Sequence, residues 1–289
     1  MTSDRLFTPK STADGSYTFF STEFQETFHS SFGAKQEAEV RYIEPCQIEQ
    51  LAKQKSTIRL LDVCYGLGYN SAAAIETAWS VNPRCRIELV ALELKPDVPQ
   101  QAIAYDLLSS WQFRIPEFLA ELASESSLCR EFLTAELIFG DARQTIQAIA
   151  DRDWQADAIF LDPFSPSKCP QLWTIEFIEQ VARCLSPMGR LATYSCSAAV
   201  RTALRTAGLH LGSVTGAGRK SPGTICSFEY KNLPGLSERE REHLQTRAAI
   251  PYRDRTSQDS REQIIDNRQR EQQTSSLEST SKWRKRWLM

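Results

Sequence analysis

The stretch LLDVCYGLGYN at residues 60–70 is the most informative part of this sequence for the fold. An apolar run ends in Asp62, and Gly66 and Gly68 follow just before a helix-like segment. Cys64 stands where the common form of such a loop has its first glycine. Glycine lets the backbone approach a ligand closely, and a helix N-terminus presents unpaired N–H groups. The stretch therefore indicates either a cofactor-binding turn or an ordinary turn between a strand and a helix.

The surrounding sequence alternates between short apolar runs and helix-length segments. The predicted strands are 57–64, 86–94, 135–141, 156–162, 189–195, 210–216 and 224–230, and the predicted helices are 68–80, 98–109, 170–185 and 197–207. Such alternation predicts an α/β fold, in which helices cover both faces of a mostly parallel, seven-stranded, Rossmann-like sheet. No helix separates the last two strands, which are expected to form a hairpin.

The pattern divides the chain into three parts. Residues 1–56 are predicted to form an N-terminal extension, a hairpin followed by a helix interrupted near Pro45. Residues 57–236 form the α/β domain. Residues 237–289 form a polar tail with 12 Lys or Arg and 9 Asp or Glu residues, expected to be partly flexible. The tail ends in SKWRKRW (281–287), whose tryptophans either dock onto the domain or, with the flanking cations, contact nucleic acid.

Composition excludes several classes of protein. The formal net charge of −2 gives no global signal for nucleic acid or a membrane, and no apolar run of about 18 residues predicts a transmembrane helix. The N-terminus lacks the apolar core of a signal peptide, so we expect a cytoplasmic protein. The eight cysteines contain no Cys-x-x-Cys pair and there are three histidines. We therefore expect neither a metal site nor a disulfide framework.

Carboxylates at the predicted strand ends indicate which cofactor the turn would bind. An acid at the end of the first strand, Asp62, would repel a pyrophosphate but suits a ligand with an ammonium group and a ribose, such as S-adenosylmethionine. Glu93 ends the second strand, where it could accept hydrogen bonds from ribose hydroxyls, and Asp141 after the third could accept from an adenine amino group. Each acid alone is better explained as a cap or turn residue, but the whole series predicts a cofactor site.

The motif LDPF follows the fourth strand and indicates the type of reaction. Asp162, Pro163 and Phe164 resemble the Asp-Pro-Pro-Tyr motif of amino-group methyltransferases. In that motif a carboxylate and a backbone carbonyl accept hydrogen bonds from an NH₂ group, while the aromatic ring packs on the base. Methyl transfer to a neutral amine depends mainly on such positioning.

Three longer motifs resemble one family. They are TADGSYTFFSTEFQETFHSSFGAKQEAEVRYI (12–43), LDPFSPSKCPQLWT (161–174) and GAGRKSPGT (216–224). They are similar to the class I S-adenosylmethionine-dependent methyltransferases that complete 5-methylaminomethyluridine at the tRNA wobble position, the methyltransferase half of bifunctional MnmC proteins. The chain looks like a stand-alone form of that half, which implies no FAD.

The resemblance implies a substrate and a partner. The substrate would be 5-aminomethyluridine, 2-thiolated or not, at the wobble position of tRNA, and the product the 5-methylaminomethyl form. An upstream complex that modifies wobble uridine would supply this substrate.

The resemblance also implies a set of site residues. The predicted cofactor residues are Asp62, Gly66, Gly68, Asn70, Glu93 and Asp141, covered by Tyr17, Ser21, Glu26 and His29 of the N-terminal stretch. Asp162, Pro163 and Phe164 would hold the amine, and Lys168, Trp173, Arg219 and Lys220 would contact tRNA. Each residue of the tRNA set also has a structural explanation. Lys168 could be an ordinary loop lysine, Trp173 a core residue, and Arg219 and Lys220 part of a solvated turn.

Two other functions are compatible with these patterns. One is a class I methyltransferase that acts on a different small-molecule or protein amine, because one fold supports many substrates. The other is a non-catalytic Rossmann-like binding module, which Cys64 makes conceivable. A nicotinamide dehydrogenase is less favoured because the Gly-x-Gly-x-x-Gly pattern is absent.

Overall fold

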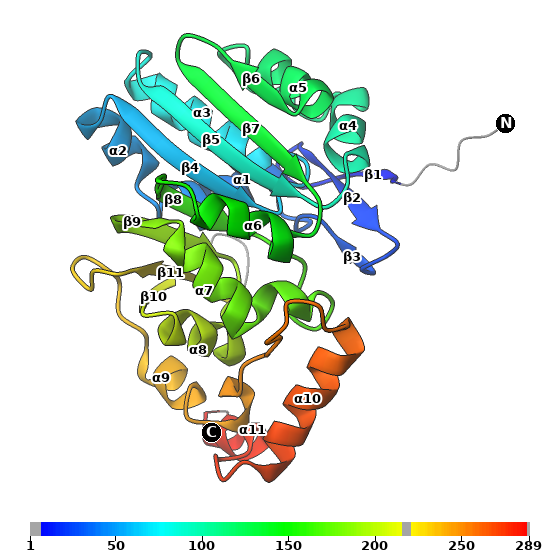
Figure 1. The fold of residues 1–289 in the computed structure, drawn as a ribbon, viewed down its shortest axis with the longest axis vertical. Coiled ribbons are helices and arrows are strands. Elements are labelled where there is room, and N and C mark those ends of the chain that lie inside the picture. Colours follow the sequence, from blue (N-terminus) through cyan, green and yellow to red (C-terminus); the bar gives the residue numbers. More distant parts are fainter. Residues whose placement is uncertain (1–6, 216–220, 288–289) are drawn as a thin grey trace, which may run out of the picture.

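Strand β4 (Thr57–Val63) lies near the middle of an eight-stranded sheet with the order β10-β11-β9-β8-β4-β5-β7-β6. The computed structural model describes residues 7–215 and 221–287 of the chain (Figure 1). The last four residues of β4 are buried, as expected of a central parallel strand with both faces covered. The other strands are β5 (Arg86–Glu93), β6 (Ser127–Cys129), β7 (Leu133–Phe139), β8 (Ala156–Leu161), β9 (Leu185–Thr193), β10 (His210–Val214) and β11 (Gly223–Ser227).

The predicted fold class is confirmed, with one more strand than expected. Strands β5, β4, β8 and β9 run parallel with β7, and β10 and β11 form the expected antiparallel hairpin. The additional strand, β6, pairs antiparallel with β7. Its three residues are too short to produce a recognisable pattern in the sequence.

Helices pack on both faces of the sheet (Figure 1). One face carries α1 (Ala34–Ala38), a π-helical turn (Glu39–Ile43), α2 (Ile48–Gln54), α3 (Tyr69–Val81), α4 (Asp97–Ala104) and α5 (Ile115–Glu125). The other carries α6 (Ala142–Ala150), a 3-10 turn (Pro170–Trp173), α7 (Ile175–Arg183) and α8 (Ala198–Thr206). The sequence prediction missed α5 and α6.

The N-terminal extension forms a small sheet of its own, in the order β1-β2-β3. Its strands are β1 (Pro9–Ser11), β2 (Tyr17–Ser21) and β3 (Glu26–Thr27). Phe19 of β2 is fully buried and contacts the ring of Tyr105, with ring centroids 5.7 Å apart. This contact anchors the small sheet beside the carboxyl end of the main sheet.

The C-terminal tail is more regular than its polar composition suggested. It forms α9 (Glu238–His243), a 3-10 turn (Arg247–Ala249), α10 (Arg261–Thr274) and α11 (Thr280–Arg286). Ile264 is fully buried in the same core as α7 and α8, and Trp283 is 6% exposed. A few apolar residues suffice to dock these polar helices, and the partial flexibility expected of the tail stays a prediction.

No helix in the two described segments combines the length and the apolar character needed to cross a membrane.

Candidate active site

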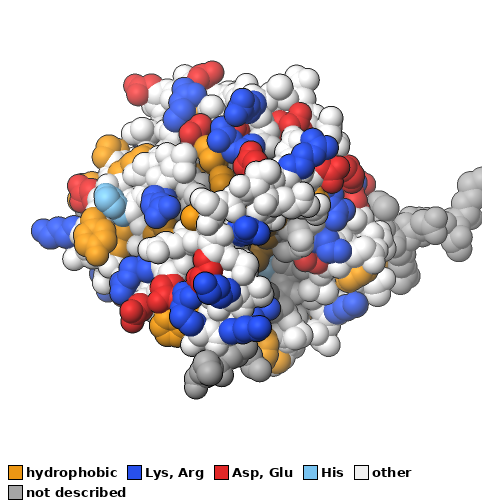
Figure 2. Space-filling model, turned by 90° about the horizontal axis from the view of Figure 1, so that it is seen from below, with side chains coloured by type: hydrophobic (Ala, Val, Ile, Leu, Met, Phe, Trp, Pro, Cys, Tyr) orange, Lys and Arg blue, Asp and Glu red, His pale blue; other side chains and the backbone are white. Residues whose placement is uncertain are grey.

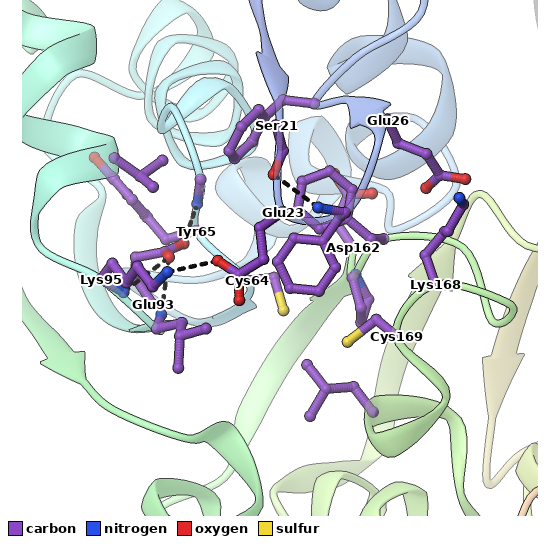
Figure 3. A pocket seen from close by; sticks show the side chains of 18 of the residues that line it. Ser21, Glu23, Glu26, Cys64, Tyr65, Glu93, Lys95, Asp162, Lys168 and Cys169 are labelled. Carbon is purple, nitrogen blue, oxygen red and sulfur yellow. Dashed lines mark hydrogen bonds and ion pairs between the residues drawn. The ribbon is translucent and has the colours of Figure 1, made fainter. Parts of the chain in front are cut away.

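A cavity of about 910 Å³ opens at the carboxyl ends of β4, β5, β7 and β8 (Figure 3). The parallel register brings these ends together, because Asp62 pairs with Ala91 of β5 on one side and with Phe160 of β8 on the other. Open α/β sheets bind ligands at this edge. The N-terminal sheet supplies part of the wall, including Ser21 and Glu26.

The turn after β4 adopts the strained conformation that glycine favours. Cys64, Gly66 and Gly68 have φ angles of +71°, +57° and +85°. A Cβ atom at Gly68 would lie 2.5 Å from the hydroxyl oxygen of Tyr65, so this position is closed to a side chain. Cys64 and Gly66 line the cavity, whereas Gly68 lies outside its lining. Close packing against Tyr65 accounts for a glycine at position 68, and its predicted cofactor role stays a prediction.

Glu93 connects the end of β5 to this turn. Its carboxylate accepts hydrogen bonds from the N–H of Gly66 at 2.9 Å, of Leu94 at 2.8 Å and of Lys95 at 3.2 Å. Burial raises the pKa of Glu93, and the three donors oppose that rise. Figure 3 shows Glu93 on the side of the cavity that carries Tyr65 and Lys95. The side chain is thus held where the sequence placed it.

Asp62 does not reach the cavity. It is fully buried, and its Oδ2 accepts a hydrogen bond from the hydroxyl of Ser71 at 2.7 Å. Burial raises the pKa of Asp62 to about 8. Asp62 therefore lies beneath the turn, outside the cavity lining, and its predicted contact with a cofactor ammonium stays a prediction.

Asp141 lines the cavity and also caps α6. Its Oδ1 accepts from the N–H of Arg143 at 2.9 Å, and its Oδ2 forms an ion pair with the same guanidinium at 2.7 Å. The alternative of a helix cap therefore holds for Asp141, and its predicted contact with adenine stays a prediction.

The Asp-Pro-Phe motif lies at the end of β8, on the cavity wall. The amide of Asn70 donates to Oδ2 of Asp162 at 3.0 Å, and the hydroxyl of Tyr194 donates to the carbonyl of Pro163 at 2.9 Å. Phe164 stacks on Phe24 with ring centroids 4.4 Å apart. The motif is held from both sides, so its carboxylate has a defined position.

The N-terminal sheet is attached directly to this motif. Glu26 of β3 accepts hydrogen bonds from the backbone N–H and the hydroxyl of Ser165. Ser21, Glu26 and His29 line the cavity as predicted. Tyr17 is not among the residues that line the cavity, and it is 45% exposed.

The four residues predicted to contact tRNA lie in different environments. Lys168 lines the cavity. Trp173 is fully buried, and its Nε1 donates to the carbonyl of Phe164 at 2.8 Å, so it is a core residue that supports the motif and cannot touch tRNA. Arg219 and Lys220 lie outside the described residues.

Among the cavity residues that escaped the sequence prediction, Tyr194, Gln171 and Arg261 carry polar groups that could contact a ligand. Tyr194 follows β9, and Gln171 lies in the 3-10 turn after the motif. A polar residue at a strand end could have drawn attention to Tyr194. Arg261 comes from the tail, at the start of α10, and no local pattern connects it to the site.

Comparison with known proteins agrees with this geometry. Residues 101–229 match a family model described as S-adenosyl-L-methionine-dependent methyltransferase. The crystal structure of MnmC2 from Aquifex aeolicus superposes with a TM-score of 0.81 and 31% identity, covering 93% of this chain and 86% of that one.

Two relatives among curated proteins show how far the similarity extends. An uncharacterized protein of Methanocaldococcus jannaschii is 28% identical, over 89% of this chain and 70% of its own length. The tRNA 5-methylaminomethyl-2-thiouridine biosynthesis bifunctional protein MnmC of Ralstonia nicotianae is 29% identical over 77% of this chain. The match covers 34% of that protein, so the chain resembles about a third of it. With a sheet-edge cavity, a turn built on glycines and this similarity along nearly its whole length, the chain belongs to the MnmC-type S-adenosyl-L-methionine-dependent methyltransferases.

Proposed function

We propose that this chain transfers a methyl group from S-adenosylmethionine to the primary amine of 5-aminomethyluridine, 2-thiolated or not, at the wobble position of tRNA. The observation that carries the proposal is the Asp162-Pro163-Phe164 motif, which is held at the cavity wall by Asn70 and Tyr194. The names of the curated relatives, which refer to tRNA 5-methylaminomethyl-2-thiouridine biosynthesis, support the choice of substrate.

The residues of the cavity fit S-adenosylmethionine. Glu93 offers a carboxylate to ribose hydroxyls, and Asp141 offers one to an adenine amino group. Gln171 lines the same cavity, and its Oε1 is a buried acceptor without a hydrogen-bond partner among the described residues. Buried acceptors usually have a donor, so a ligand amino or hydroxyl group would satisfy this atom. When bound, the cofactor would supply an electrophilic methyl group.

The chain's own contribution to the reaction is to position and deprotonate the amine. An alkyl ammonium has no lone pair, so the amine must lose a proton before it can attack. The carboxylate of Asp162 would accept a hydrogen bond from the amine and then its proton. The carbonyl of Pro163 would accept a second N–H, which leaves the lone pair aimed into the cavity. Phe164, stacked on Phe24, would pack against the uracil base.

The proposal is tested by methylating two tRNA transcripts of one sequence, one with 5-aminomethyluridine at the wobble position and one unmodified. We expect methylated nucleoside, detected by mass spectrometry after nuclease digestion, only from the aminomethylated tRNA. Methylation of neither tRNA, together with turnover of a small-molecule or protein amine, would contradict the proposal. Failure to bind S-adenosylmethionine in calorimetry would favour a binding module instead.

A variant at Asp162 tests the proposed chemistry. Asp162→Asn keeps the shape and an acceptor for Asn70 but removes the charge, so kcat should fall roughly 100-fold, the scale of a missing general base. The affinity for S-adenosylmethionine should change little. Asp266→Asn, on the exposed side of α10, is the matched control and should keep full activity. A kcat near that of the wild type in Asp162→Asn would refute the role.

A further inference from the structure

The tail places Arg261 beside the motif loop. Arg261 is the first residue of α10, lines the cavity, and donates from Nη2 to the carbonyl of Ser167 at 3.1 Å. The next residue along the motif loop, Lys168, lines the same cavity. Both side chains are partly exposed. Two cations from distant parts of the sequence thus line the same cavity, and one of them is bonded to the residue that precedes the other.

These two cations differ from the others that line the cavity. Lys95 forms an ion pair with Glu23 at 2.5 Å, and Arg143 forms ion pairs with two aspartates. Arg261 and Lys168 have no carboxylate within ion-pair distance among residues 7–215 and 221–287. Glu26, which Figure 3 shows above Lys168, has both carboxylate oxygens on Ser165. Their positive charge therefore remains available to a ligand.

A buried ion pair fixes the loop that leads to Arg261. Asp254 is 1% exposed and accepts from Nη1 of Arg143 at 2.8 Å, and its other oxygen accepts from the N–H groups of Gln258 and Asp259 at 3.1 Å. Burying an ion pair carries a large desolvation penalty, so the pair between Arg143 and Asp254 adds little to the stability of the fold. Its main effect is to hold the loop before Arg261 in one position. Ser260 then caps α10 with a capping box, which sets the direction in which Arg261 leaves the loop.

We propose that Arg261 and Lys168 together bind a backbone phosphate next to the nucleotide whose base enters the cavity. A guanidinium and an ammonium that line one cavity suit a phosphodiester, because both donate charge-assisted hydrogen bonds to its oxygens. The deeper wall carries the carboxylates Glu93 and Asp162, which repel phosphate but accept from an amine or a hydroxyl. This inference rests on the proposed function, since it assumes a nucleic-acid substrate.

Salt-dependent binding of tRNA provides the test. Removing one phosphate contact should lower the slope of log K against log salt by about 0.7 to 0.9. We expect that slope change for Arg261→Gln and for Lys168→Gln, and a weaker Kd for tRNA, roughly tenfold in the double variant. Arg270→Gln removes the same charge from an exposed site on the same helix and is the matched control, with an unchanged slope. The affinity for S-adenosylmethionine should stay that of the wild type.

Three results would overturn the inference. The slope could stay unchanged in both variants, Arg270→Gln could lower it as much as Arg261→Gln, or both variants could weaken S-adenosylmethionine binding, in which case the cations serve the cofactor. The outcome is separable from that of the proposed function. A lower slope without methylation of aminomethylated tRNA would support the phosphate contact and contradict the proposed reaction. Methylation of that tRNA with an unchanged slope would support the reaction and contradict the phosphate contact.

Discussion

Cys64 holds a backbone conformation in which a side chain is unfavourable. Its φ of +71° places it in the left-handed region, in a turn where two glycines adopt the same sign of φ. Such a conformation costs a residue with a Cβ atom about 1–2 kcal/mol. The sequence left open whether this is a cofactor-binding turn or an ordinary one, and the structure shows that the turn forms with Cys64 in the strained conformation. Burial also raises the pKa of this thiol, so it remains protonated at neutral pH.

This strain predicts how Cys64 responds to substitution. Cys64→Val should destabilise the protein by about 1–3 kcal/mol, because a β-branched residue is an outlier at positive φ. The unfolding free energy of Cys64→Gly should stay within about 1 kcal/mol of the wild type. The relief of backbone strain offsets the larger conformational entropy that glycine loses on folding. Cys129→Val, at an exposed position in β6, is the control and should change stability by less than about 0.5 kcal/mol. Equal urea midpoints for Cys64→Val and Cys129→Val would show that the turn carries no strain.

Asp62 makes the unfolding free energy depend on pH. The ordinary pKa of an aspartate is about 3.9, and burial raises the pKa of Asp62 to about 8 in the folded protein. Between these values the folded chain holds a proton that the unfolded chain has released. The contribution of Asp62 to stability therefore falls as the pH rises from about 4 to about 8.

Asp62→Asn removes this titration. Relative to the wild type, the variant should gain about 1–4 kcal/mol of unfolding free energy between pH 5 and pH 8, measured by urea denaturation without cofactor. Asp266→Asn, an exposed change of the same kind, should follow the wild-type curve at both pH values. A constant difference between Asp62→Asn and the wild type across this range would mean that Asp62 ionises normally.

At the scale of elements, short polar contacts join pieces that the sequence does not connect. Strand β3 is fastened to the motif loop through Glu26 and Ser165, and the 254–260 loop is fastened to α6 through Asp254 and Arg143. The last helix, α11, docks on α9, where Trp283 stacks on His243 with ring centroids 4.2 Å apart. Trp283 therefore acts as a latch between α11 and α9, and a contact between the exposed cations of this segment and nucleic acid stays a prediction.

Docking of α11 predicts a large effect of Trp283→Ala. Removing a buried tryptophan that is also contacted by the guanidinium of Arg239 should destabilise the tail by about 2–4 kcal/mol and expose Lys282–Arg286 to trypsin. Lys282→Ala, at the exposed neighbouring position, should leave tryptic cleavage after Arg284 at the wild-type rate. S-adenosylmethionine affinity should be retained in both variants. Wild-type protease resistance in Trp283→Ala would argue against the latch.

At the scale of the whole molecule, charge is spread over the surface. Figure 2 shows Lys and Arg side chains interspersed with acidic ones over the face seen from below. The net charge of −2 gives no global attraction for nucleic acid. Affinity for tRNA would then depend on a few placed cations, and binding should be modest and sensitive to salt.

Local periodicity was enough to predict the sheet, its alternation with helices and the edge at which Glu93, Asp141 and Asp162 lie, because parallel strands end together. It could not predict which polar groups reach the cavity. Asp62 and Trp173 carry suitable chemistry but are buried under the turn and the motif, whereas Arg261 reaches the cavity from a polar helix far along the chain. Burial and contacts between distant segments depend on packing in three dimensions, which leaves no periodic signal in the chain.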